Sequence, residues 1–227
     1  MKTYNLPQKA RCLIFDIDST LYTCPQYAQE QIDCQIRCYS QLRSIPAEEG
    51  RRLIKDFRQT WAKEHGGQTI SLGNTFLRLG ISIEENVRWR KTLITPEAFL
   101  KEDPLLINTL TQLKAHYCLE CVTNNPVSIG RRTLQALGIS PLIQEVTGLD
   151  TCLKSKPAKE MFDHALSSAS RALNSKITYS DCISIGDRYD IDLSLPLQYG
   201  SGAILINDVQ EIYKLPALLL KTPAPRT

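Results

Sequence analysis

Short apolar runs alternate with longer amphipathic stretches along most of the chain. Apolar runs of roughly 4–8 residues with polar flanks are typical of buried strands, and apolar residues that recur with the helical period predict helices. Such alternation predicts an α/β fold, with a parallel sheet covered by helices on both faces. The predicted strands are 11–16, 117–123, 143–147, 181–185 and 203–206, and the predicted helices are 104–115, 127–137, 157–172 and 190–199.

The chain between the first strand and residue 104 carries helical patterns and no convincing strand. Connections between a strand and the next helix are normally only a few residues long, so this stretch predicts an inserted helical domain. We place that domain at 22–95 and the α/β core at 1–21 and 96–227. The inserted helices are predicted at 26–42, 46–65, 70–79 and 83–92, and Thr222–Thr227 are predicted to form a frayed tail.

Bulk composition excludes several classes of protein. The chain has 227 residues, of which 42% are hydrophobic, so it can bury a large core. Its net charge of +3 is too small to indicate a nucleic-acid polymer as partner. No apolar stretch is long enough to cross a membrane, and Met1–Ala10 lack the apolar core of a signal peptide. We therefore expect a cytoplasmic protein with neither a membrane nor a nucleic-acid partner.

Eight cysteines are scattered along the chain, and only Cys118 and Cys121 have a spacing that suggests a metal or redox site. They lie within one predicted strand, where residues three apart point to opposite faces of the sheet. We therefore expect buried free thiols at these positions.

Two carboxylates, Asp16 and Asp18, directly follow the first apolar run. On a continuing strand they would share one face, where like charges raise each other's pKa. A divalent cation relieves that repulsion, and carboxylate oxygens suit Mg²⁺. One carboxylate can act as a nucleophile and its neighbour as an acid or base. The alternative is that Asp18 and Ser19 simply form a turn or helix cap.

Further polar residues follow other predicted strands. Thr123 and Asp187 come at or just after the ends of two of them. The carboxyl ends of parallel strands lie at one edge of a sheet, which is where ligands bind in such folds. We therefore expect Asp16, Thr123 and Asp187 to meet at this edge.

Four segments, taken in order, resemble the motifs of phosphatases of the haloacid dehalogenase superfamily. They are DIDST at 16–20, TNN at 123–125, KP at 156–157 and GDRYDID at 186–192. The resemblance covers nearly the whole chain and implies a Rossmann-like core. The helical insert after the first motif resembles the C1 cap of these enzymes. Ser19 departs from the pattern, since glycine most often follows the second aspartate.

The resemblance implies roles for the residues of the first three motifs. Asp16 would attack phosphorus to form an aspartyl-phosphate, and Asp18 would act as acid and then as base. Thr123 and Asn124 would contact the phosphoryl group, although Thr123 could instead belong to a helix N-terminus. Lys156 would offset the charge of Asp16 and the phosphoryl group. Lys154 offers the same charge two residues earlier, but Pro157 makes Lys156 the better match.

For the metal, the resemblance implies Mg²⁺ held by Asp16, the backbone carbonyl of Asp18 and Asp187. The family spacing selects Asp192 as a further ligand that acts through water. Asp190 is the alternative, and it could instead be a helix cap.

The substrate implied is a small phosphorylated metabolite. Residues 15–22, with His65-Gly66-Gly67, are similar to pyrimidine 5′-nucleotidase-like phosphatases, which suggests a nucleoside 5′-monophosphate. The alternatives are a phosphoglycolate phosphatase-like enzyme, a sugar-phosphate phosphatase or mutase, and a non-catalytic phosphoryl-binding scaffold. The presence of Asp18 argues against a dehalogenase. The glycine pair could also be only a helix-ending turn.

Overall fold

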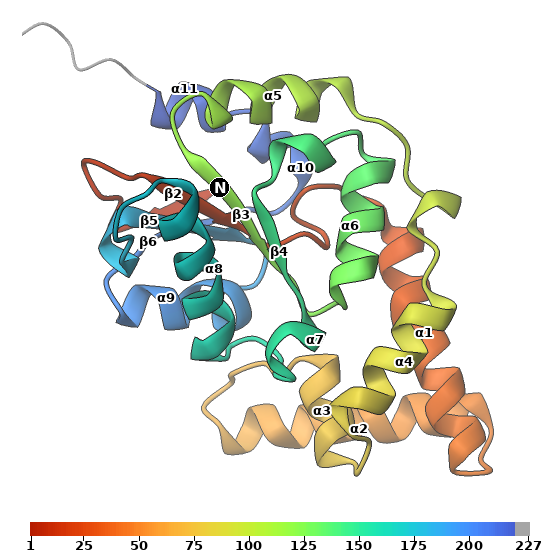
Figure 1. Cartoon of the computed structure of the whole chain (residues 1–227). Coiled ribbons are helices and arrows are strands. Elements are labelled where there is room, and N and C mark those ends of the chain that lie inside the picture. The colour runs from red at the N-terminus through yellow and green to blue at the C-terminus, as the bar shows by residue number, and fades with distance from the viewer. Residues whose placement is uncertain (221–227) are drawn as a thin grey trace, which may run out of the picture.

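A computed structural model describes residues 1–220, and the tail predicted at Thr222–Thr227 lies outside this range. A six-stranded sheet with helices on both faces forms the core (Figure 1). The strands are arranged in the order β1-β6-β5-β2-β3-β4. Their bounds are β1 Lys2–Tyr4, β2 Cys12–Phe15, β3 Cys118–Val122, β4 Glu145–Thr147, β5 Cys182–Gly186 and β6 Gly202–Leu205. The predicted α/β class and its five strands are confirmed.

The edge strand β1 was not predicted from the sequence. It runs antiparallel to β6, whereas the other four pairings are parallel, so the sheet is mixed. The prediction of a wholly parallel sheet is therefore wrong at this edge. The reason is that β1 has only three residues, two of them exposed, and shows no apolar run.

The central strand β2 is buried on both faces of the sheet. Leu13 and Phe15 belong to the larger apolar cluster, on the face covered by α5, α6, α10 and α11. Cys12 and Ile14 point the other way, into the cluster under α8 and α9. This two-sided burial explains why the strand reads as a continuous apolar run.

Three short core helices, α7, α10 and α11, were not predicted, and those predicted at 104–115, 127–137 and 157–172 lie close to their expected positions. An exception is the helix predicted at 190–199, which is a π-helical turn followed by a short α-helix. The core helices are α5 Pro104–Lys114, α6 Val127–Ala136, α7 Leu149–Cys152, α8 Lys159–Ala172, α9 Ser194–Gln198, α10 Val209–Ile212 and α11 Leu215–Leu219. Shorter 3₁₀ turns span Pro96–Ala98, Ser140–Leu142 and Tyr179–Asp181, and the π-helical turn spans Tyr189–Leu193.

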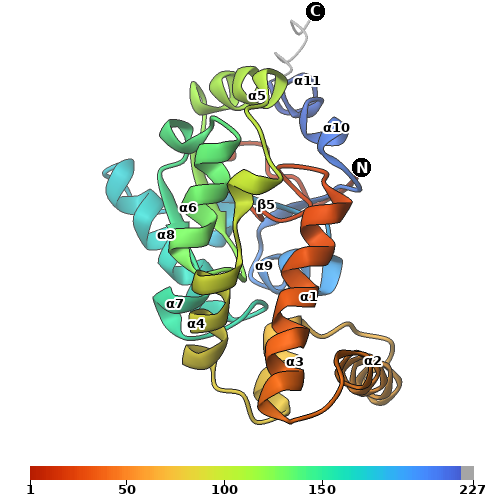
Figure 2. The same cartoon turned by 90° about the vertical axis from the view of Figure 1, so that its right-hand side faces the viewer.

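The inserted segment forms four helices with an apolar cluster of their own. These helices are α1 Pro25–Leu42, α2 Ala47–Glu64, α3 Leu72–Arg78 and α4 Ile83–Leu93. The cluster consists of Ile36, Tyr39, Ile54, Phe76, Ile81 and Trp89. In Figures 1 and 2, α2 and α3 lie at the end of the molecule opposite α5 and α11. We call α1–α4 the helical insert; the boundaries 22–95 stay a prediction.

The turn after α2 contains the glycine pair noted in the sequence. Gly66 and Gly67 have φ of +63° and +87°, which favours glycine. The structure therefore gives this pair a helix-ending role, and neither glycine lines the pocket described below.

All eight cysteines are free thiols. Cys121 packs in the larger core cluster and Cys118 beside the cluster under α8, so the two point to opposite faces as predicted.

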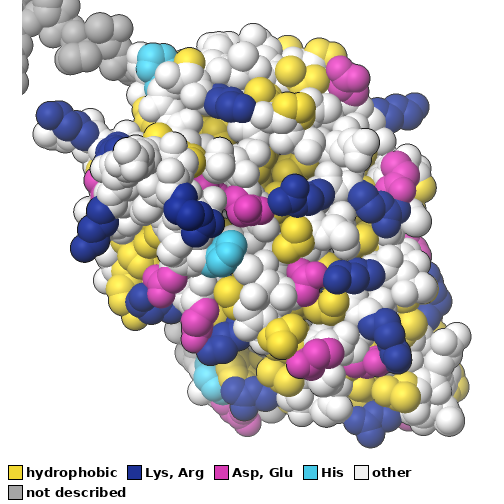
Figure 3. Space-filling view, viewed as in Figure 1, with side chains coloured by type: hydrophobic (Ala, Val, Ile, Leu, Met, Phe, Trp, Pro, Cys, Tyr) yellow, Lys and Arg dark blue, Asp and Glu magenta, His cyan; other side chains and the backbone are white. Residues whose placement is uncertain are grey.

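Over residues 1–220, we find no helix both long and apolar enough to cross a membrane. On the face seen in Figure 3, basic and acidic side chains are interspersed instead of forming a patch of one sign.

The helical insert offers a direct test of its packing. Phe76 is fully buried against Tyr39 and Trp89, whereas its neighbour Leu77 is 47% exposed. We expect Phe76→Ala to lower the free energy of unfolding by about 3–5 kcal/mol through loss of packing. The control Leu77→Ala should change it by less than about 0.5 kcal/mol. Urea unfolding measures both, and equal effects would contradict the packing described.

Candidate active site

The sequence-predicted residues meet where the strand order reverses at β2. Asp16 follows β2, and the neighbouring strands β3 and β5 are followed by Thr123 and Asp187. The backbone N–H of Asp16 donates to the carbonyl of Ile185 at 2.8 Å, which fixes the end of β2 against β5. Ligands of α/β sheets bind at such a point.

Lys156 lies at the centre of the site and is 1% exposed. Its Nζ is 2.6 Å from Asp16 Oδ1 and 2.7 Å from Asp192 Oδ1. It also donates to the carbonyl of Val122 at 2.8 Å, so its hydrogen-bonding capacity is filled. Burial alone lowers the pKa of Lys156, but the two carboxylates outweigh it and raise that pKa above its usual value. Lys156 is therefore a fixed positive charge beside Asp16.

Asp187 completes an acidic cluster with Asp16 and Asp192. One carboxylate oxygen from each lies within 4.8 Å of the other two. Gly186 allows this approach, because a Cβ there would stand 2.5 Å from the Cβ of Asp192 and 2.8 Å from its Oδ2. Asp192 is further held by the backbone N–H of Arg188 at 3.0 Å.

This cluster disfavours full ionisation. Burial raises the pKa of Asp16 to about 8, with Asp192, Asp187 and Asp18 adding to the rise and Lys156 opposing it. Burial also raises the pKa of Asp187 to about 6, and the charge of Asp192 adds to it. More positive charge is needed to keep Asp16 ionised near neutral pH.

The donor set fits a hard divalent cation. Three carboxylates converge within 4.8 Å, with one lysine to offset their charge. Mg²⁺ prefers oxygen ligands of this kind, and Asp16, Asp187 and Asp192 are the residues that would hold it.

Asp18 is held by an extensive hydrogen-bond network. Its Oδ1 accepts from Tyr22 Oη at 2.7 Å and from Gln31 Nε2 of α1 at 2.9 Å. Its Oδ2 accepts from Asn125 Nδ2 at 2.9 Å and from Thr123 Oγ1 at 3.2 Å. The carboxylate orientation is therefore fixed by Tyr22, by two residues that follow β3 and by Gln31 of the helical insert.

Ser19 has a φ of +61°, in the left-handed region that favours glycine. Ser19 stands where the resemblance leads us to expect glycine, and it adopts a backbone conformation that glycine favours.

The segment after β3 supplies three polar side chains. The hydroxyl of Thr123 is fully buried; besides donating to Asp18, it accepts from the backbone N–H of Asn125 at 3.0 Å. Asn124 Oδ1 accepts from the backbone N–H of Lys156 at 2.6 Å. Its Nδ2 is buried and has no hydrogen-bond partner among the described residues. Asn124 therefore has a free donor, whereas the Thr123 hydroxyl is already used.

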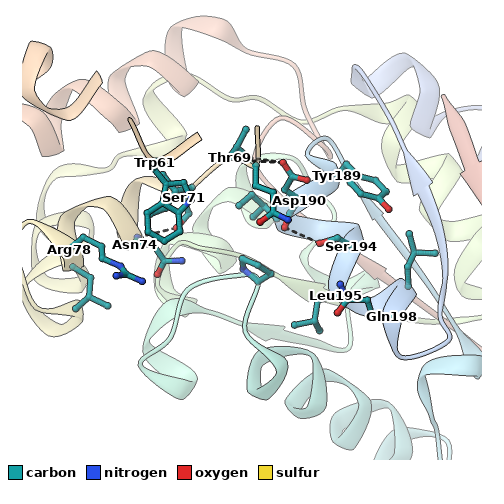
Figure 4. A pocket seen from close by; sticks show the side chains of 16 residues that line it. Trp61, Thr69, Ser71, Asn74, Arg78, Tyr189, Asp190, Ser194, Leu195 and Gln198 are labelled. Carbon is teal, nitrogen blue, oxygen red and sulfur yellow. Dashed lines mark hydrogen bonds between the residues drawn. The ribbon is translucent and has the colours of Figure 1, made fainter. Parts of the chain in front are cut away.

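The competing residues lie elsewhere. Asp190 Oδ2 accepts from the backbone N–H of Thr69 at 3.0 Å, in a cleft of about 790 Å³ beside α2, α3 and α9 (Figure 4). Neither Asp16 nor Asp18, the predicted catalytic carboxylates, is among the described residues that line this cleft. Lys154 lies at the surface and pairs with Glu160.

A pocket of about 210 Å³ opens onto Asp16, Asp18 and Asp187. Several of its residues were not assigned a role from the sequence. They are Gln31, Arg58, Arg90, Asn125 and Arg188. The helical insert supplies the first three, and sequence spacing gives no signal for contacts between segments so far apart in the chain.

A comparison with known protein families identifies the family of the chain. The sequence profile of the haloacid dehalogenase-like hydrolases matches residues 10–195. The chain belongs to this hydrolase family. Its match spans the acidic cluster, Lys156 and the whole helical insert.

Solved structures of this hydrolase family share the fold at low sequence identity. The HAD-hydrolase YfnB from Bacillus subtilis, bound to magnesium, has a TM-score of 0.57 at 18% identity, with 92% of this chain and 99% of that chain covered. The HAD phosphatase from Thermococcus onnurineus has 0.56 at 19%, with 92% and 97% covered. A 2-haloacid dehalogenase from Pseudomonas syringae pv. Tomato DC3000 has 0.54 at 18%, with 93% and 98% covered. Similarity at this level shows the fold alone.

Replacing Lys156 tests the central ion pairs. Lys156→Met leaves Asp16 and Asp192 buried without their cation, which should lower the free energy of unfolding by about 3–5 kcal/mol. Lys154→Met makes the same chemical change at the surface and should leave stability nearly unchanged. Chemical denaturation at pH 7 compares the two. Similar stabilities would contradict the central role of Lys156.

The raised carboxyl pKa values predict how Mg²⁺ affects stability. Without a bound cation, the pKa values of Asp16 and Asp187 are higher in the folded state than in the unfolded state. Between these values the folded protein keeps protons on both carboxyls that the unfolded chain releases. Their contribution to stability is therefore full below about pH 4 and is lost as pH rises through about 6 to 8. A Mg²⁺ concentration 100 times the dissociation constant measured at pH 8 should raise Tm by roughly 5–10 °C at pH 8. The same concentration should raise Tm by less at pH 5.5, where protons compete for the carboxylates. An equal gain at both pH values, or an undiminished gain in Asp187→Asn, would refute this account.

Proposed function

We propose that this hydrolase is a Mg²⁺-dependent phosphomonoesterase that acts through an aspartyl-phosphate on Asp16. One observation carries the proposal: Asp16 and Asp18 face one small pocket, and Asp16 also belongs to the acidic cluster with Asp187 and Asp192. A nucleophile, an acid/base and a cation site thus converge on one place. Phosphoryl transfer depends mainly on such positioning and on neutralisation of charge.

Asp16 is suited to attack phosphorus. Lys156 holds one of its oxygens at 2.6 Å and helps keep the carboxylate ionised. In the first step the Asp16 oxygen bonds to phosphorus while the bond to the ester oxygen breaks. In the second step water attacks phosphorus, and Asp16 is released as a carboxylate with inorganic phosphate.

Asp18 is suited to move the proton in both steps. It would protonate the departing ester oxygen and then accept the proton of the attacking water. The donors from Tyr22, Gln31, Asn125 and Thr123 hold it in one orientation. We assign Thr123 to the positioning of Asp18, and direct contact of its hydroxyl with phosphate stays a prediction.

Two further groups would bind the phosphoryl oxygens. The buried Nδ2 of Asn124 is an unused donor in a residue that lines the pocket. Mg²⁺, held by Asp16, Asp187, Asp192 and the backbone carbonyl of Asp18, would supply positive charge to the phosphoryl group.

A dehalogenase is the principal competing activity, since the shared fold includes one. A halide leaves carbon as an anion and needs no proton, so that reaction gives no use to Asp18 or to the cation site. Both features favour phosphoryl transfer.

The helical insert would serve as the cap over this pocket, because Gln31, Arg58 and Arg90 contribute to its wall. Ligand pockets for drug-sized molecules measure about 300–1,000 Å³, so a pocket of about 210 Å³ favours a smaller phosphorylated metabolite. The size argues for a phosphoglycolate-like or small sugar-phosphate substrate over a nucleoside 5′-monophosphate. We also propose that the enzyme is cytoplasmic.

Phosphate release from a panel of phosphorylated metabolites tests the activity. The panel should contain nucleotides, sugar phosphates and phosphoglycolate, each with Mg²⁺ and with EDTA. We expect turnover only with Mg²⁺, and a loss of roughly 10³-fold or more in Asp16→Asn, which removes the nucleophile. Full activity of Asp16→Asn would show that the nucleophile is wrongly assigned.

The two candidate acids of the fourth motif provide a matched pair of variants. We expect Asp192→Asn to lose roughly 10²-fold or more in kcat/KM, because Asp192 contacts Lys156 and belongs to the acidic cluster. Asp190→Asn should stay within a few-fold of the unmodified enzyme, since Asp190 bonds to Thr69 in the neighbouring cleft. The reverse order of effects would transfer the metal role to Asp190.

A further inference from the structure

Three arginines line the small pocket without a carboxylate partner. Arg58 comes from α2, Arg90 from α4 and Arg188 from the segment after β5. Over residues 1–220, none of them has a guanidinium nitrogen within 4.0 Å of a carboxylate oxygen.

Three other arginines of the helical insert are paired with carboxylates. Arg37 pairs with Glu30, Arg51 with Asp33, and Arg88 with Glu85. Arg52 and Arg78 of the insert are also without a carboxylate within 4.0 Å among the described residues, but both are exposed to solvent. The pocket arginines differ in that they are partly or fully buried and still unpaired.

These guanidinium groups also have unused donors. Arg58 Nη2 donates to the carbonyl of Ile70 at 3.2 Å. Arg90 donates from Nε to Asn86 Oδ1 at 3.0 Å and from Nη1 to Asn125 Oδ1 at 2.8 Å. Of the described residues, none accepts a hydrogen bond from Arg90 Nη2 or from the Arg188 side chain. A guanidinium has five N–H donors, so most of this capacity remains free.

The charge of Arg188 also opposes the charges of Arg58 and Arg90. Burial lowers the pKa of Arg58, and the charge of Arg188 lowers it further. Burial lowers the pKa of Arg90 to about 10; Asp18 opposes this fall and Arg188 adds to it. Partly desolvated cations that repel each other gain stability when an anion binds among them.

The position of these arginines relates them to the substrate. They share the pocket with Asp16, so a molecule whose phosphoryl group lies at Asp16 has its other end within the same small volume of about 210 Å³. Among the described residues that line this pocket, none is a tyrosine, phenylalanine or tryptophan that could stack on a nucleobase.

We propose that the substrate is a small phosphate monoester with a second anionic group, which Arg58 and Arg90 of the helical insert bind in the pocket shared with Asp16. A carboxylate and a second phosphate both suit guanidinium donors, so the shared chemistry is a dianionic or more highly charged small molecule with two acidic ends. This inference rests on the proposed phosphomonoesterase activity and deepens it by naming the substrate class. Arg90 also positions Asn125, so Arg58 is the cleaner residue to test.

Three matched probes separate the possibilities. 2-Phosphoglycolate has a carboxylate at its second end, ethylene glycol bisphosphate has a phosphate, and 2-hydroxyethyl phosphate has a neutral hydroxyl. We expect kcat/KM for at least one of the first two to exceed that for the neutral probe by roughly 10- to 100-fold, as for a lost charge-assisted hydrogen bond. The carboxylate and bisphosphate arms show which anion is preferred. Equal kcat/KM for all three probes would overturn the inference and leave the phosphatase proposal intact.

Variants at position 58 then test the residue. Arg58→Gln should bring the ratio between the charged and neutral probes close to one, while Arg58→Lys should keep part of it. Arg52 lies exposed on the same helix, and Arg52→Gln should keep the full ratio. A ratio that is unchanged in Arg58→Gln, with folding verified by circular dichroism, would exclude Arg58 from recognition.

Binding provides a readout that does not depend on turnover. Calorimetry on Asp16→Asn with Mg²⁺ compares the three probes where no hydrolysis is expected. Tighter binding of a charged probe, weakened when Arg58→Gln is added, supports the inference even if the proposed reaction fails. Equal binding of charged and neutral probes, or no binding of any, overturns it.

Discussion

The buried ammonium of Lys156 is the interaction on which the rest of this site depends. It joins Asp16 after β2 to Asp192 in the π-helical turn and is also bonded to the end of β3. Three segments that are far apart in the chain are thereby fixed at one edge of the sheet. Without that charge, the acidic cluster would be a concentration of buried carboxylates with no compensation. With Lys156 present, the negative charge of the three carboxylates still exceeds the positive charge. One divalent cation such as Mg²⁺ would balance it.

A second network links the core to the helical insert. Gln31 of α1 donates to Asp18 and accepts from Asn125, and Asn125 in turn accepts from Arg90 of α4. Asp18, the proposed acid/base, is therefore held partly by a residue of the insert. Movement of α1 and α4 relative to the sheet would change both the shape of the pocket and the orientation of Asp18, so that substrate enclosure and catalytic geometry are coupled.

Features that depend on residues close together in the sequence could be predicted, whereas features that depend on contacts between distant segments could not. The central strands were predicted because each is an apolar run buried on two faces, whereas β1 has only three residues and no such run. The convergence of Asp16, Thr123 and Asp187 was predicted because each follows a strand of one sheet. Asn125, Gln31 and Arg58 were not assigned, since their roles depend on contacts across the insert. Arg90 could not be distinguished from Arg88 by sequence. Only the fold shows that Arg88 has a carboxylate partner, whereas Arg90 has none within residues 1–220.

The measurement that tests the central claim most directly is the detection of the covalent intermediate. The enzyme is mixed with Mg²⁺ and a substrate that it hydrolyses, and the reaction is quenched in acid within the first turnovers. The protein is then digested, and the masses of its peptides are measured by mass spectrometry. The account predicts one added phosphoryl group on Asp16, with a larger yield in Asp18→Asn, where hydrolysis of the intermediate is slowed. A phosphoryl group on another residue, or none at any quench time during rapid turnover, would contradict it.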